Sequence, residues 1–283
     1  MADRLSSTNA AKVSESNSLD MSTCKAAQQY TYYKQRATPG GLIIAEATNI
    51  TPTDRGSWGS PDIFAPQQIE AWRHVTKAVH GKMFLQLSDN RSAAENALKA
   101  GFDGVELHAA NGYLLEQFLH DGINDRADQY GGSVENRARF LFEALEAILE
   151  SLDSSKVGIR LSPFGGSFGD KDSDPIATYT YVLNRLNNYD LAYARKGSAR
   201  QFRETYKGVL LAASGFDRQS AVQIVEEGAA DAVAIGRHFI SNPDLVRRFQ
   251  LNKPVNDYDT DTFYLGDARG YTDYNTRSCR TSR

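Results

Sequence analysis

The chain has few of the residues that stabilise small secreted domains or hold metal ions. Among its 283 residues are only two cysteines, Cys24 and Cys279, which stand near opposite ends of the chain. Two distant thiols give neither a disulfide framework nor a C-x-x-C pair of metal ligands. The sequence therefore predicts reduced thiols, no bound metal and a cytoplasmic protein.

Long apolar runs and blocks of like charge are also missing. No apolar run approaches the roughly 18 to 20 residues that a membrane-spanning helix requires, and residues 1–20 lack the apolar centre of a secretory signal. The net charge is −3, which argues against nucleic acid and anionic membranes as partners. We therefore expect a small molecule as the partner, and the sequence leaves the oligomeric state open.

The beginning of the chain differs in composition from the rest. Residues 1–29 are polar and show neither a two-residue nor a 3.6-residue apolar period, which predicts a disordered leader. The pattern then indicates a single domain over residues 30–275 and a flexible tail over residues 276–283. A domain of this size can bury one substantial core.

Short apolar runs alternate with longer amphipathic segments, which is typical of repeated strand and helix units in a parallel sheet. The predicted strands are Leu42–Ala47, Met83–Leu87, Gly104–His108, Val157–Leu161, Val209–Ala213 and Asp231–Gly236. A strand-like stump at Leu191–Ala194 breaks off into the charged stretch ARKGSARQFRE. Six strands and a stump are too many for a small doubly wound sheet and too few for a closed (β/α)8 barrel.

Predicted helices lie between the strands. They are Pro66–His80, Arg91–Ala100, Val134–Leu152, Ala177–Asn188, Arg218–Glu227 and Pro243–Gln250. Ser133 is a candidate cap for the third helix, and Ser241 and Asn242 are candidate caps for the last.

A cluster of polar side chains follows the strand Gly104–His108. His108, Asn111 and Tyr113 all lie within the short stretch GVELHAANGYLL. Loops at the carboxyl ends of parallel strands surround the site in α/β enzymes, and these side chains supply hydrogen-bond donors and a proton source. The alternative is a structural loop with a half-buried tyrosine, because a lone histidine at a strand end is more often structural.

The segment around this cluster resembles a known family. GFDGVELHAANGYLLEQFLHDGINDRADQYGGSVENRARF, over residues 101–140, is similar to the central motif of the Old Yellow Enzyme family. This family comprises FMN-dependent ene-reductases and includes the plant 12-oxophytodienoate reductases. Further similarity lies in YYKQRATPGGLIIAEAT (32–48), KVGIRLSP (156–163), AIGRHFISNPDL (234–245), DTFY (261–264) and RGYTDY (269–274).

The resemblance implies a fold and an activity. The fold is an α/β (β/α)8 TIM barrel, here incomplete, because the family's first strand and most of the strand after Tyr193 have no counterpart. The activity is that of an FMN-dependent oxidoreductase, with NADPH as electron donor. It reduces the C=C bond of α,β-unsaturated carbonyl compounds, and oxylipin-type enones are candidate substrates.

The resemblance also implies roles for single residues. His108 and Asn111 would donate hydrogen bonds to the substrate carbonyl, Tyr113 would protonate the substrate, and Tyr264 would contact it. The implied cofactor-binding residues are Ala47, Gln86, Arg160, Ser214, Gly215, Gly236 and Arg237. Glycine-containing loops after two successive strands can bind a phosphate. Without the resemblance, Arg160 could equally form an ion pair with a neighbouring carboxylate.

Two other interpretations remain open at this point. The chain could be a catalytically impaired or inactive truncated homologue of the family, because segments of the barrel are missing. It could also be a (β/α)8 enzyme that binds a sugar phosphate and uses His108 and Tyr113 as acid and base. The sequence disfavours this last interpretation, since no Schiff-base lysine or metal cluster stands at a strand end.

Overall fold

The centre of the molecule is a curled parallel sheet. The computed structural model describes residues 27–53, 60–88, 91–165, 172–263 and 268–276. Seven strands follow one another in sequence order, and each is parallel to the next. They are β1 (Leu42–Ala45), β2 (Lys82–Leu87), β3 (Gly104–Ala109), β4 (Val157–Leu161), β5 (Tyr193–Lys196), β6 (Leu210–Ala213) and β7 (Ala232–Ala234).

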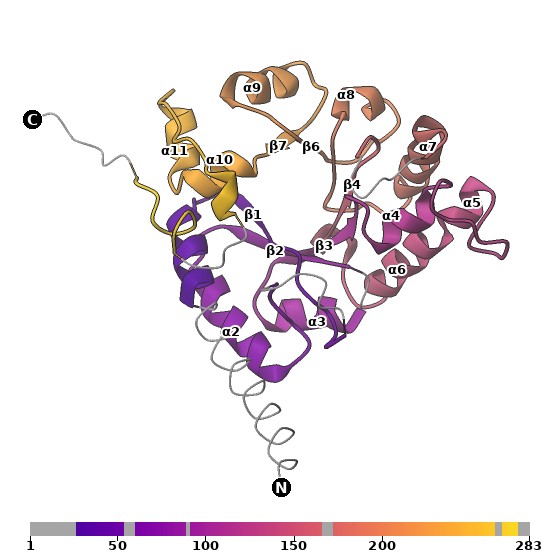
Figure 1. Cartoon of the computed structure of the whole chain (residues 1–283), viewed down its shortest axis with the longest axis horizontal. Helices are drawn as coiled ribbons and strands as arrows, with labels where there is room; N and C mark the ends of the chain where they lie inside the picture. The colour runs from indigo at the N-terminus through magenta and orange to yellow at the C-terminus, as the bar shows by residue number, and fades with distance from the viewer. Residues whose placement is uncertain (1–26, 54–59, 89–90, 166–171, 264–267, 277–283) are drawn as a thin grey trace, which may run out of the picture.

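The sheet is a partial (β/α)8 barrel, as the sequence predicts. Within the described ranges β1 and β7 each pair with a single strand, so the sheet does not close on itself. A closed barrel of this class has eight strands. The helices stand around the outer side of the curled sheet (Figure 1). The central strand β3 is therefore buried on both sides, with all six of its residues buried, whereas none of the three residues of β7 is buried.

Six strands lie where the sequence predicts them, with ends that differ by at most two residues. The prediction for β5 is wrong in its position. The expected stump Leu191–Ala194 is replaced by Tyr193–Lys196, which pairs with both β4 and β6. Two charged residues extend this strand because each finds an interior contact. Arg195 is paired with Glu106, and Lys196 lies 3.7 Å from the ring centre of Phe202.

The described helices follow the strands in sequence. They are α2 (Pro66–Lys77), α3 (Arg91–Lys99), α4 (Leu114–Leu119), α5 (Val134–Arg137), α6 (Arg139–Leu149), α7 (Pro175–Leu186), α8 (Ala199–Phe202), α9 (Arg218–Glu226), α10 (Arg237–Ser241) and α11 (Leu245–Gln250), with 3₁₀ turns at Ser154–Lys156 and Thr260–Thr262. Residues 27–36 are also helical, so ordered structure begins before the predicted boundary at residue 30. The rest of the predicted leader lies outside the described residues. None of the described helices is long and apolar enough to cross a lipid bilayer.

Two helix boundaries illustrate what local signals can predict. Ser133 caps α5 as expected, because its side chain accepts a hydrogen bond from the backbone nitrogen of Asn136. The predicted start at Pro243 is wrong, since Ser241 still belongs to α10 and α11 begins at Leu245. Asn242 instead bonds to a distant loop, where its side-chain oxygen accepts from the backbone nitrogen of Asn256 at 2.6 Å.

Aromatic side chains fill the barrel interior towards the starts of the strands. Phe84, Tyr193 and Leu211 form a separate cluster of buried residues. Two glycines leave the space that the rings occupy. A Cβ at Gly104 would lie 2.6 Å from the Phe84 ring, and one at Gly158 would lie 2.4 Å from the Tyr193 ring. Phe84, Tyr193 and Leu211 thus fill this part of the interior, and the polar interior side chains lie nearer the carboxyl ends of the strands.

Helix 27–36 is fixed to the C-terminal part of the chain by Arg36. The Arg36 guanidinium donates to the backbone oxygens of Phe239 (3.0 Å), Ile240 (2.6 Å) and Tyr271 (3.1 Å). Tyr32 stacks on Tyr271 with ring centres 4.2 Å apart. Helix 27–36 leads into β1, and α10 follows β7. These contacts therefore connect the two strands that leave the barrel open.

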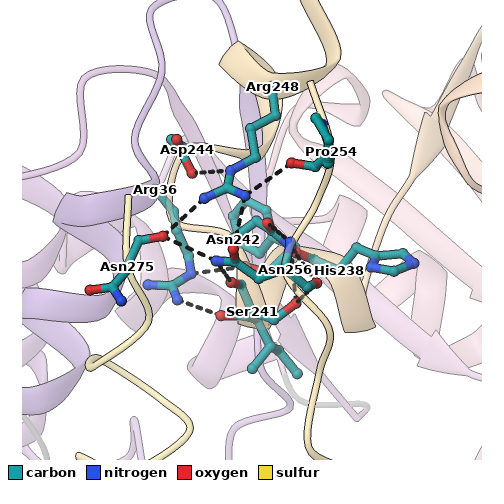
Figure 2. Close-up of polar contacts among 11 residues, drawn as sticks. Arg36, His238, Ser241, Asn242, Asp244, Arg248, Pro254, Asn256 and Asn275 are labelled. Atoms are coloured by element: carbon teal, nitrogen blue, oxygen red, sulfur yellow. Dashed lines mark hydrogen bonds and ion pairs between the residues drawn. The ribbon is translucent and has the colours of Figure 1, made fainter. Parts of the chain in front are cut away.

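A second arginine fixes the last described segment. Arg248 donates to the side chain of Asp244 (2.7 Å) and to the backbone oxygens of Pro254 (3.0 Å) and Asn275 (2.9 Å). Figure 2 shows Arg36 and Arg248 pointing into the same group of polar residues around Asn256. The chain after α11 is therefore anchored next to helix 27–36.

Candidate functional site

Strand β3 carries the first residue of the candidate site. Because side chains alternate along a strand, Glu106 and His108 point to the same side, which is the barrel interior. His108 pairs in register with Arg160 of β4 and is 6% exposed. Its Nδ1 atom is buried without a hydrogen-bond partner in the described structure. Burial, together with the positive charges of Arg160 and Arg195, lowers the pKa of His108 to about 3. The imidazole is therefore neutral near pH 7.

The loop after β3 turns sharply and is held by a buried carboxylate. Asn111 and Gly112 have φ angles of 58° and 75°, a left-handed conformation that asparagine and glycine adopt more readily than other residues. The Asn111 backbone nitrogen donates to Ser162 Oγ at 2.7 Å, and that of Gly112 donates to Glu116 at 2.6 Å. Ser162 and Tyr179 also donate to Glu116, at 2.5 and 2.6 Å. Glu116 thus fixes the loop directly through Gly112 and indirectly through Ser162.

The same turn presents Tyr113 at the mouth of the barrel. Tyr113 is the residue that precedes α4, and its backbone nitrogen bonds to the oxygen of Ala110. Its side chain is 48% exposed, and its ring centre lies 4.8 Å from that of His108. The site thus combines a buried neutral imidazole with a solvent-accessible phenol.

Arg160 joins β4 to this loop. Its two terminal nitrogens lie 3.2 and 2.9 Å from one side-chain amide atom of Asn111, which must be the oxygen because a guanidinium only donates. The Asn111 amide nitrogen is then turned away from Arg160 and can donate to a ligand. In the described part of the chain no carboxylate lies within ion-pair distance of Arg160. Burial, followed by the charge of Arg195, lowers the pKa of Arg160 to about 10.

A polar layer adjoins His108 and Arg160 inside the barrel, where Glu106 stands two residues before His108 on β3 and Arg195 is in register with Arg160. Gln86 of β2 donates through Nε2 to Glu106 at 2.6 Å. Arg195 of β5 donates to both oxygens of the same carboxylate, through Nε at 2.7 Å and through Nη2. Gln86 is therefore inside the barrel, and the structure adds two charged residues, Glu106 and Arg195, next to the candidate site.

The expected phosphate-binding residues follow two neighbouring strands. Ser214 and Gly215 come directly after β6 with φ angles of 95° and 74°, and both are exposed. Gly236 directly precedes α10, Arg237 is the first residue of that helix, and both are also exposed. A Cβ at Gly215 or Gly236 would meet no atom within 4 Å, so both loops border open space.

For two expected site residues, Ala47 and Tyr264, the structure gives no support for a contact with a ligand. Ala47 lies beyond the end of β1 at Ala45, where it is exposed and not part of the strand that was predicted to reach it. Tyr264 lies outside the described residues, so its contact with a substrate stays a prediction.

Sequence reasoning missed three residues of this region. Glu106 shares the face of His108 at a spacing of two, so strand alternation alone could have identified it. Glu116 and Arg195 gave no local signal, because their partners Ser162 and Glu106 are 46 and 89 positions away in the sequence. Glu116 holds the loop that carries Asn111 and Gly112, and Arg195 holds Glu106.

Comparison with known proteins agrees with this geometry. The chain matches the model of the NADH:flavin oxidoreductase / NADH oxidase family over residues 8–91 and 86–256. It is 41% identical to 12-oxophytodienoate reductase 1 of Oryza sativa subsp. japonica, over 86% of this chain and 82% of the relative. It is 35% identical to 12-oxophytodienoate reductase 2 of Arabidopsis thaliana, over 86% and 85%.

Solved structures give the same result for the fold. Morphinone reductase superimposes with a TM-score of 0.86 at 36% identity, over 91% of this chain and 89% of that chain. The old yellow enzyme from Trypanosoma cruzi superimposes with a TM-score of 0.85 at 29% identity, over 89% of each chain. The chain belongs to the NADH:flavin oxidoreductase / NADH oxidase family and, within it, to the Old Yellow Enzyme group that its sequence resembles.

Proposed function

We propose that the protein is an ene-reductase that binds FMN at the mouth of the partial barrel, takes electrons from NADPH and reduces the C=C bond of α,β-unsaturated carbonyl compounds. Family membership implies FMN and a nicotinamide nucleotide. One observation supports the location of the site above all others. His108, Asn111, Tyr113 and Arg160 converge from two strands and one loop at the carboxyl end of the sheet.

The residues present fit FMN. Arg160 is a largely buried cation without a carboxylate partner in the described chain, so an electron-rich ring edge is a suitable neighbour for it. Gln86 of β2 supplies an amide inside the same barrel. The loops at Ser214–Gly215 and Gly236–Arg237 border open space after neighbouring strands, which suits a phosphate group. When bound, FMN supplies the hydride for the alkene carbon.

His108 and Asn111 act on the substrate carbonyl in this proposal. His108 is in register with Arg160, and the Asn111 oxygen accepts from the Arg160 guanidinium. Both side chains carry an N–H group that a ligand can accept. Negative charge develops on the carbonyl oxygen as hydride reaches the conjugated carbon, and donors at that oxygen lower the barrier. Because His108 stays neutral, it stabilises this charge by a hydrogen bond and does not transfer a proton.

Tyr113 then delivers the proton to the other alkene carbon. Its accessible position beside His108 lets its hydroxyl reach a substrate whose carbonyl is bound by His108 and Asn111. A positioned acid contributes typically about 10²- to 10⁴-fold to rate. The alternative of an inactive truncated homologue is not needed, since the partial barrel still brings these groups together.

The substrate class and the electron donor are the finer parts of the proposal. The relatives are named for 12-oxophytodienoate and morphinone, and we propose a cyclic or oxylipin-type enone for this chain. NADPH is our proposal for the donor. One morphinone reductase structure holds tetrahydroNAD, so NADH and NADPH must be compared directly. A cytoplasmic location also remains a proposal, supported by the wide separation of Cys24 and Cys279.

The visible spectrum of the purified protein tests the proposal. A yellow protein with flavin absorbance, which bleaches with NADPH and recovers when cyclohexenone is added, is the expected result. A protein that stays colourless after incubation with excess FMN contradicts the proposed function.

Tyr113→Phe tests the assignment of the proton donor. We expect alkene reduction to slow by about 100-fold or more, while reduction of the flavin by NADPH stays within about twofold of wild type. Tyr130→Phe is the matched control, because Tyr130 bonds to Glu143 on the surface at 3.0 Å. Equal loss of both half-reactions in Tyr113→Phe would argue against a proton-donor role.

A further inference from the structure

The polar layer next to the candidate site consists of three hydrogen-bonded side chains from three strands, Gln86 of β2, Glu106 of β3 and Arg195 of β5. Arg195 donates hydrogen bonds to both carboxylate oxygens of Glu106, and Gln86 donates to one of them at 2.6 Å. Glu106 is fully buried, and the Arg195 side chain is 13% exposed. Strand β4 lies between β3 and β5, and its residue paired with Glu106 is Gly158. No β4 side chain therefore separates the two charged groups.

The contacts of Glu106 determine how the Gln86 amide is oriented. An ionised carboxylate only accepts hydrogen bonds, and the guanidinium that pairs with it stays charged. Gln86 must therefore turn its amide nitrogen to Glu106 and its carbonyl oxygen away from it. Gln86 is 5% exposed, and no donor to its Oε1 occurs among the described residues. This oxygen is not fully enclosed by protein, so a ligand that donates a hydrogen bond can reach it.

We propose that Arg195 is a positioning residue of the flavin site. Through Glu106 it fixes Gln86 with its carbonyl oxygen presented to the ligand, so that the site selects a ring that donates a hydrogen bond there. This inference rests on the proposed function, in which FMN is the ligand. The oxidised isoalloxazine ring has one such donor, the imide N3–H of its pyrimidine part. Arg195 thus acts on the ligand through two other side chains.

The same ion pair separates the roles of the two interior arginines. Arg195 and Arg160 are neighbours in register on β5 and β4. Glu106 neutralises Arg195, whereas Arg160 has no carboxylate at ion-pair distance in the described chain. Only Arg160 therefore remains available as a cation for the ligand. A replacement of Arg195 should change the orientation of Gln86 without removing the cation at Arg160.

Exchange of the flavin N3 proton with solvent tests this inference. FMN labelled with ¹⁵N at position 3 is bound to the full chain, and the N3–H signal is followed by NMR. In the wild type we expect exchange at least about tenfold slower than in Arg195→Met, since a hydrogen bond of about 1.4 kcal/mol corresponds to a factor of ten. Loss of Arg195 removes the ion pair that fixes Glu106, so Glu106 no longer holds Gln86 in one orientation.

Two further variants separate positioning from folding. Arg195→Met/Glu106→Gln leaves no lone buried charge, so it should fold even where the single variant fails, and its N3–H should still exchange fast. Arg203→Met is the control, because Arg203 pairs with Asp231 at 2.8 Å outside the barrel interior. It should retain the wild-type exchange rate.

The outcomes distinguish this inference from the proposed function. Wild-type exchange rates in both Arg195 variants, with FMN bound, overturn the role of Arg195 and leave the proposed function intact. Fast exchange in the wild-type complex overturns it as well. A wild-type protein that does not bind FMN contradicts the proposed function, and the role of Arg195 fails with it.

Discussion

At the scale of single residues, the environment of His108 determines its protonation. The side chain is buried beside Arg160, the charge of Arg195 acts on it as well, and no carboxylate is among the causes that shift its pKa to about 3. In the unfolded chain a histidine has a pKa of about 6.5. The unfolded state therefore binds a proton between about pH 6.5 and 3 that the folded state does not.

This difference predicts that acid destabilises the wild type through His108. The free energy of unfolding should fall as pH decreases from 6.5, by up to about 2 kcal/mol at pH 5. His108→Asn should remove this part of the pH dependence, as measured by urea unfolding at pH 5 and pH 7.5. His74→Asn, which changes an exposed side chain, is the control. A profile for His108→Asn that parallels the wild type would show that His108 titrates normally.

The candidate site was predictable where its residues are close in sequence. His108, Asn111 and Tyr113 lie on one strand end and one loop, so local spacing is enough to bring them together. Arg195 depends on strand register, because β4 lies between β3 and β5 and pairs Gly158 with Glu106 and Arg160 with Arg195. No local pattern encodes such a pairing. The sequence therefore predicts the groups that contact the substrate better than those that hold them.

At the scale of elements, β5 is the strand that the sequence predicts least well. Its four residues are YARK, and charges in a central strand are unusual because an unpaired buried charge is costly. Arg195 meets this requirement through Glu106. Lys196 does not, since its Nζ is buried without a hydrogen-bond partner in the described structure. Burial, with the charge of Arg203, lowers the pKa of Lys196 to about 7.

Lys196 should make the protein more stable at alkaline pH. An unfolded lysine has a pKa of about 10.4. Between about pH 7 and 10.4 the unfolded state binds a proton that the folded state lacks, so stability rises with pH over this range. Lys196→Met should therefore stabilise the protein at pH 7 by on the order of 2 kcal/mol, with a gain that shrinks towards pH 10.

Urea unfolding at pH 7 and pH 9.5 measures this effect. Lys207→Met is the control, because the Lys207 side chain is 68% exposed. A loss of stability in Lys196→Met at pH 7 would mean that the contact with the Phe202 ring outweighs the burial of the amine.

At the scale of the whole molecule, the partial barrel must be stabilised without a closing strand. In the described chain the sheet ends at β1 on one side and at β7 on the other. Helix 27–36, α10 and the segment around Tyr271 meet beside these strands, and Arg36 connects all three. Figure 1 shows α10 and α11 next to the first part of the chain. Side-chain contacts thus replace part of what strand pairing supplies in a closed barrel.

Replacement of Arg36 should therefore loosen both sides of the opening. Arg36 is 2% exposed and donates to the backbone oxygens of Phe239, Ile240 and Tyr271. Arg36→Met would leave these acceptors without their donor, which should lower the free energy of unfolding by about 2–4 kcal/mol. Hydrogen exchange should accelerate in helix 27–36 and α10 and stay unchanged in α6. Arg126→Met, at a surface arginine paired with Asp128, is the control. Uniform acceleration through the whole sheet would show that Arg36 supports the core in general and not the opening, whereas acceleration confined to the two flanking segments would establish that they close the partial barrel.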